Sequence, residues 1–111
     1  MSDHPARAAA AAAHIRDLAQ ATTDPRSAYA DPAQLASVTG SLLDLARHLE
    51  DALDHLERGV RHTGDGDWAA ADGGAPRRAE HAVQSARAEA RNMSRALARA
   101  VEALGRLKSA P

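Results

Sequence analysis

Aspartate and histidine side chains recur along one predicted helix, with the chemistry and spacing of metal ligands. They are Asp44, His48, Asp51, His55 and His62, separated by three, four or seven residues. At about 100° per residue these positions share one helix face. One helix supplies only two of the three or four ligands that a metal needs. His48, Asp51 and His55 are therefore the metal candidates, beside two other interpretations: solvated Asp–His pairs and a pH-sensitive contact. The sequence predicts no metal and no cofactor.

Arginines form a second spaced set, towards the carboxyl end of the chain. Residues 77–108 hold eight Arg and Lys against three Glu, a net charge of +5. Such a row can neutralise phosphates or contact an acidic protein. The whole chain is slightly acidic, at −1, and few aromatic residues are present to stack on bases. We expect this stripe to point away from the core, either as a solubilising surface or as a partner contact. The candidate contact residues are Arg87, Arg91, Arg95 and Arg99.

Trp68 is the only tryptophan, in the sequence Gly-Asp-Gly-Asp-Trp. Two interpretations stay open for it: a ring folded over the end of a hairpin, or an exposed anchor for a partner, since tryptophan is enriched at binding hot spots. The neighbouring aspartates lack the order and length of a calcium-binding loop.

Catalytic patterns are missing from the sequence. It contains no cysteine, no serine in a nucleophile-elbow pattern and no glycine-rich phosphate loop. A small helical bundle also encloses little volume for a substrate. We therefore expect a protein that is not an enzyme.

The elements that position these residues are two long amphipathic helices. Apolar residues recur every three or four positions over 35–60 and again over 79–107, which is the spacing of one helix face. The predicted core is Leu35, Val38, Leu42, Leu45, Leu49, Leu53, Leu56, Val60, Val83, Met93, Leu97, Val101 and Leu104.

Element boundaries follow from the capping and breaking residues. Residues 1–31 are read as an alanine-rich helix over 5–21 and a linker. Residues 32–108 are read as a hairpin, which Asp31-Pro32 begins as an acid cap and a first-turn proline. A glycine-rich loop over 63–76 separates a helix at 32–62 from one that opens at Pro76. Gly40 marks a possible kink or close helix contact. The fold class is all-α: a long antiparallel helical hairpin with a short N-terminal helix packed on it, as a three-helix bundle.

Composition indicates a thin core. Alanine supplies 29 of the 111 residues, whereas Leu, Ile and Val together supply 16 and Phe none. Small cores commonly gain stability by oligomerisation. No apolar run approaches the roughly 20 residues that span a membrane, and no signal-peptide core is present, so we expect a cytoplasmic protein.

The leucine-rich helix that follows Asp31-Pro32-Ala33-Gln34-Leu35, with its glycine and aspartate loop and its alanine and arginine helix, resembles small uncharacterised helical proteins of high-GC actinobacteria. The likeness covers residues 31–107, is largely compositional and implies no activity. More loosely, the hairpin is similar to the secreted WXG100-type helical hairpins. Those proteins carry Trp-x-Gly at the turn, where this chain has Trp68-Ala69-Ala70, and it lacks their C-terminal Tyr signal.

These features predict a non-enzymatic helical interaction module that self-associates or binds a partner protein by burying the leucine stripe. The alternative is a nucleic-acid-associated accessory protein that uses the arginine stripe.

Overall fold

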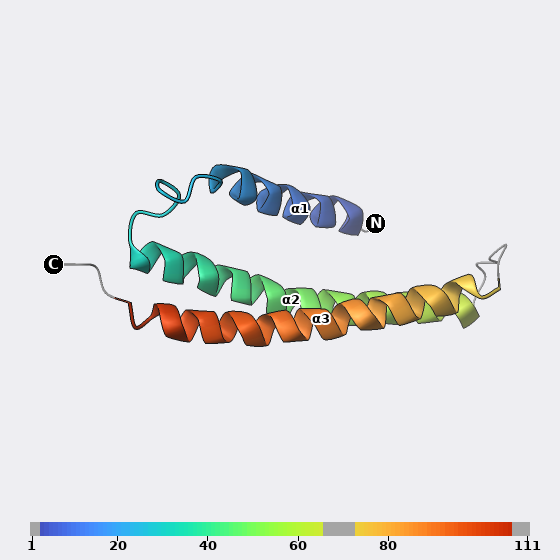
Figure 1. Cartoon of the computed structure of the whole chain (residues 1–111). Coiled ribbons are helices and arrows are strands. Elements are labelled where there is room, and N and C mark those ends of the chain that lie inside the picture. Colours follow the sequence, from blue (N-terminus) through green and yellow to red (C-terminus); the bar gives the residue numbers. More distant parts are fainter. Residues whose placement is uncertain (1–2, 66–72, 108–111) are drawn as a thin grey trace.

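The computed structural model describes residues 3–65 and 73–107, and over these ranges its regular secondary structure consists of helices alone. Its elements are α1 (His4–Ala21), α2 (Pro32–Asp65) and α3 (Ala75–Leu104). In Figure 1, α2 and α3 lie side by side and antiparallel, whereas α1 runs separately along one side of the hairpin. The prediction of an all-α helical hairpin with a short N-terminal helix is confirmed.

The start of α2 follows the predicted capping pattern. The Asp31 carboxylate accepts a hydrogen bond from the backbone N–H of Gln34 at 2.9 Å. The Gln34 side chain in turn accepts one from the backbone N–H of Ala30 at 2.8 Å. Two N–H groups that have no partner within the helix are thereby satisfied. These contacts fix where the hairpin begins.

The ends of the hairpin helices differ from the sequence-based boundaries. α2 continues through Gly64 to Asp65, and α3 begins one residue before Pro76. The predicted loop 63–76 therefore overlaps both helices at its ends. α3 ends at Leu104, before Gly105, rather than near Lys108. Glycine lowers helix propensity by only about 1 kcal/mol, so α2 continues through Gly64, whereas α3 ends at its C-cap residue Gly105.

The seam between α2 and α3 has a fixed register. Glu50 Oε2 accepts a hydrogen bond from Ser94 Oγ at 3.0 Å, and Glu57 Oε1 lies 3.6 Å from Arg87 Nη1. Seven residues forward on α2 therefore correspond to seven residues backward on α3, as in an antiparallel coiled coil. The same register places Leu43 opposite Val101, two heptads from the Glu57 layer.

The core is narrower than predicted, and its centre is rotated around α2. Leu43, Ala46 and Ala90 are the buried apolar residues, joined by the buried polar residues Glu57 and Ser94. Nine predicted core residues are half-buried: Leu35, Val38, Leu42, Leu53, Val60, Val83, Leu97, Val101 and Leu104. The other four, Leu45, Leu49, Leu56 and Met93, are exposed, and the prediction that they belong to the hairpin core is wrong. The seam of α2 passes through Leu43 and Ala46, one residue beyond Leu42 and Leu45.

The N-terminal helix stays apart from the hairpin. No Cα atom of α1 lies within 8 Å of one in α2 or α3, and α1 has no buried residue. Its large apolar side chains are only Ile15 and Leu18, and Ile15 is exposed. The expected packing of this helix into a three-helix bundle is therefore not seen, because alanine offers little apolar surface for docking.

Candidate functional site

One long side of the hairpin carries exposed large apolar side chains. Leu45, Leu49, Leu56 and Met93 are 37%, 38%, 51% and 40% exposed, and we call them the leucine face. Leu49 directly precedes Glu50, and Met93 directly precedes Ser94. Glu50 and Ser94 are hydrogen-bonded to each other across the seam. In two antiparallel helices, the same rotation from facing seam positions leads to the same side of the pair. Both helices therefore contribute to one apolar surface.

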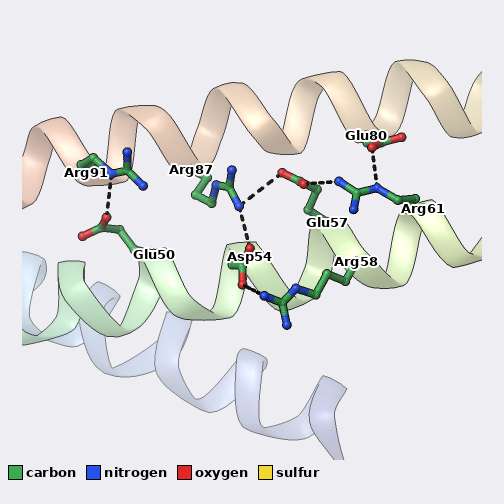
Figure 2. A network of polar contacts seen from close by, with 8 residues as sticks. All are labelled: Glu50, Asp54, Glu57, Arg58, Arg61, Glu80, Arg87 and Arg91. Atoms are coloured by element: carbon green, nitrogen blue, oxygen red, sulfur yellow. Dashed lines mark hydrogen bonds and ion pairs between the residues drawn. The ribbon is translucent and has the colours of Figure 1, made fainter.

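The opposite side of the hairpin is occupied by ion pairs (Figure 2). Arg87 Nη1 donates a hydrogen bond to Asp54 Oδ1 at 2.6 Å, and the Asp54 carboxylate also binds Arg58 at 3.0 Å. Closer to the middle of the hairpin, Arg91 lies 3.4 Å from Glu50. Asp54 and Arg91 each follow a seam residue by four positions, which turns both to this side. The hairpin thus has one apolar side and one charged side.

Towards the loop end of the hairpin, Glu57 is the most buried ionisable residue, with its side chain only 4% exposed. Its Oε2 accepts a hydrogen bond from Arg61 Nη2 at 2.7 Å, whereas Oε1 accepts none from the described residues. Arg61 also donates to Glu80 of α3 at 2.9 Å. This hydrogen bond, together with the charge of Glu80, raises the pKa of Arg61 above its usual value. Arg61 therefore links a buried carboxylate on its own helix to one on α3.

The arginine stripe is divided between two environments. Arg87 binds Asp54 of α2 and is only partly exposed, so the prediction that it points away from the core is wrong. The reason is the rotated seam, because Arg87 is itself a seam residue. Arg91 is exposed as predicted, although its Nε lies 3.4 Å from Glu50 of α2. Arg95 and Arg99 are exposed, and neither forms an ion pair within the described ranges 3–65 and 73–107.

A shallow groove lies on the charged side, between the helices. It has a volume of about 260 Å³ and is lined by Arg47, Glu50, Arg91, Ser94, Arg95 and Ala98. Three guanidinium groups and one carboxylate give it a net positive charge. Arg47 and Arg95 have no ion-pair partner among the residues that the structure describes. The groove can accept an anion of modest size.

The aspartate and histidine strip lies on the solvent-facing surface of α2. Asp44, His48, Asp51, His55 and His62 are all exposed. No group of three potential ligands gathers to hold a metal ion in the described part of the chain. His14 on α1 and His81 on α3 are exposed as well. The metal candidates therefore gain no further ligand from a neighbouring helix.

Trp68 lies outside the described residues. Glu57, the buried acid of the network, was not among the residues singled out by the sequence analysis. The sequence carries a signal for it, because Leu43, Glu50 and Glu57 follow one another at intervals of seven residues, which places them on one helix face.

Comparison with known proteins gives no relative for this chain. No protein-family model, curated protein or solved structure matches it. Among the described residues, no helix is both long and apolar enough to cross a membrane.

Proposed function

We propose that the protein is a non-enzymatic helical interaction module, which self-associates or binds a partner protein through the leucine face. One observation carries the proposal. Four large apolar side chains are at least 37% exposed on one side of a hairpin, whose other side is occupied by ion pairs. Exposed apolar patches of this kind mark protein interaction surfaces.

The chain exposes more surface than a compact monomer of its mass, because the hairpin is long and α1 stays apart from it. The accessible surface of the chain amounts to 8511 Å², whereas a compact monomer of 11.6 kDa has about 5,800 Å². The radius of gyration is 18.5 Å, against about 13 Å for a compact domain of this length. A protein that keeps so much surface exposed gains stability by covering part of it.

The test compares two exposed positions on opposite sides of the hairpin. Leu49→Glu places a charge on the leucine face, and Ala88→Glu makes a similar change at an exposed position of α3 away from it. Sedimentation velocity, together with capture of partners on the immobilised full chain, reports binding. We expect Leu49→Glu to abolish association and Ala88→Glu to leave it intact. Equal behaviour of wild type and Leu49→Glu in both assays would reject the proposal.

A phosphate-bearing partner, such as nucleic acid, is the second candidate. The groove favours it, because Arg47 and Arg95 have no carboxylate partner among the described residues and lie beside Arg91. Anisotropy of labelled DNA and RNA at several salt concentrations tests it with wild type and Arg47→Gln/Arg95→Gln. The candidate requires binding that weakens with salt, and a smaller salt dependence in the double variant. Absence of salt-dependent binding in wild type would reject it.

A further inference from the structure

The ion pairs on the charged side of the hairpin are balanced towards its loop end and unbalanced at the groove. Towards the loop, the network joins three arginines to three carboxylates (Figure 2). They are Arg58, Arg61 and Arg87 with Asp54, Glu57 and Glu80. The groove is lined by three arginines, Arg47, Arg91 and Arg95, and by one carboxylate, that of Glu50. Three cations against one anion leave the groove with a net charge of +2.

Small side chains of α3 leave the space for a ligand at this place. Ser94 lies one heptad after Arg87, and Ala98 lies one heptad after Arg91. The two arginines extend to carboxylates of α2, whereas the two small residues border a hollow of about 260 Å³. Pockets for drug-sized ligands have volumes of about 300–1,000 Å³. The groove therefore fits a small charged group.

The cations of the groove come from both helices, and one of them is anchored. Arg91 Nε lies 3.4 Å from Glu50 Oε1, and Glu50 Oε2 accepts a hydrogen bond from the buried Ser94 at 3.0 Å. The two terminal nitrogens of Arg91 form no ion pair among the described residues (Figure 2). Arg47 of α2 and Arg95 of α3 are exposed beside them. Guanidinium groups of two helices thus border one hollow with N–H donors to spare.

We propose that the groove binds a terminal phosphate group, the monoester of a phosphorylated ligand. Such a group carries about two negative charges at neutral pH and three strongly accepting oxygens. These numbers match the net charge of the groove and its three guanidinium groups. A carboxylate has one charge and two oxygens, which a single guanidinium satisfies in a bidentate pair. The inference narrows the second candidate function to a terminal phosphate, and it is independent of the leucine face.

The surroundings of the groove disfavour an extended polyanion. Asp44 and Asp51 are exposed and lie about one helical turn before and after Arg47. Neither forms an ion pair with Arg47 in the described part of the chain. A nucleic-acid strand that follows the hairpin beyond the groove would approach these carboxylates, and like charges repel. A terminal phosphate instead places its whole charge beside the three arginines.

The experiment titrates the full chain with phenyl phosphate and with phenyl sulfate, followed by NMR at constant ionic strength. The two probes have the same shape, but the sulfate ester carries only one negative charge. We expect phenyl phosphate to shift the backbone amide signals around Ser94. Its dissociation constant should be at least about fivefold lower than that of phenyl sulfate, because its second charge lies among the arginines.

Two groove variants and one control locate the binding. Arg47→Gln/Arg95→Gln removes two cations from the groove, and Ala98→Leu fills the hollow without changing the charge. Each should weaken phenyl phosphate binding at least about tenfold. Arg16→Gln/Arg106→Gln removes the same charge from two exposed arginines outside the groove, and it should change binding by no more than about twofold. Thermal unfolding verifies that every variant is folded.

A preference for the phosphate ester that both groove variants remove supports the inference. Equal affinity for the two probes, no binding of either, or an equal loss in the control variant overturns it. Single-stranded DNA with a 5′-phosphate is compared with the same DNA carrying a 5′-hydroxyl. Tighter binding of the phosphorylated end supports the terminal site. Equal, salt-dependent binding of the two DNAs without binding of phenyl phosphate overturns it and leaves the nucleic-acid candidate standing.

Free phosphoserine and a peptide that contains it distinguish two sources of the phosphate group. Both carry the same monoester, so both should bind if the groove takes a terminal phosphate. Equal affinity assigns a small phosphorylated molecule as the ligand, and tighter binding of the peptide assigns a phosphorylated protein. Failure of both to bind overturns the inference and leaves the interaction module, which depends on the leucine face, unaffected.

Discussion

Arg87 Nη1 lies 2.6 Å from Asp54 Oδ1 and 3.6 Å from Glu57 Oε1. One guanidinium of α3 therefore joins carboxylates on successive turns of α2. Sliding α3 along α2 by one heptad would replace Arg87 opposite Glu57 by Glu80 in one direction and by Ser94 in the other. The first would set two carboxylates against each other, and the second would leave Glu57 without a cation from α3. Polar seam residues of this kind select one register at some cost in stability.

Arg87→Gln should lower the free energy of unfolding by about 1–2 kcal/mol, because it removes the α3 cation from two partly buried carboxylates. Arg95→Gln is the matched control. It should change the free energy by no more than about 0.5 kcal/mol, because exposed charges contribute little to stability. Urea unfolding followed by circular dichroism measures both. Equal effects in the two variants would show that the seam arginine is as dispensable as the exposed one.

Replacing both members of the seam pair should be tolerated better than replacing one. In Glu57→Leu/Arg87→Leu, the buried carboxylate of Glu57 and the guanidinium of Arg87, which is 32% exposed, give way to apolar side chains. We expect stability within about 1 kcal/mol of wild type, because Asp54 keeps Arg58 and Arg61 keeps Glu80 as partners. The same urea experiment, with Arg87→Leu alone as the less stable reference, provides the measurement. A double variant weaker than this single variant would mean that the pair stabilises the fold outright.

The helices could be predicted from sequence because their signals are local. Apolar spacing of three and four residues, the Asp31-Pro32 cap and the position of Pro76 each act within one or two turns. The rotation of the seam could not be predicted, since Leu42 and Leu43 are adjacent leucines and either can face the core. A core centred on Leu42 instead of Leu43 is rotated by about 100° around α2, towards the leucine face.

The ion pairs of the charged side could not be predicted either, because they depend on the same rotation of the seam. Arg87 and Arg91 belong to a stripe that reads as solvent-facing if Met93 lies in the core. Their partners Glu50 and Asp54 are more than thirty residues away in the chain. Only the register between α2 and α3 brings them together, and no local pattern encodes it. The position of α1 was equally out of reach, because alanine spacing does not specify what a helix docks against.

The same truncation at two leucines should separate the core from the interface. Leu43→Ala removes a buried side chain and should cost about 2–5 kcal/mol at every protein concentration. Leu49→Ala should cost about 1 kcal/mol or less in dilute protein, because much of the side chain is already exposed. Its cost should increase with concentration as wild type associates. Urea unfolding at about 1 µM and about 100 µM protein tests this, because a hundredfold range of concentration takes a weakly associating chain from mostly free to mostly bound. Concentration-independent losses of equal size would place both leucines in the hairpin core.

Gly40→Ala should stabilise the protein by about 0.4–1 kcal/mol. Gly40 lies inside the continuous helix α2 and does not have a positive φ. A Cβ atom built at Gly40 meets no other atom within 4 Å, so the close helix contact considered from the sequence is not present. Alanine then gains helix propensity and reduces the freedom of the unfolded chain, without strain in the folded one. Gly59→Ala has equally open surroundings and should give a similar gain in thermal unfolding. A loss at Gly40 alone, with the gain at Gly59 retained, would show that α2 must bend at Gly40 in solution.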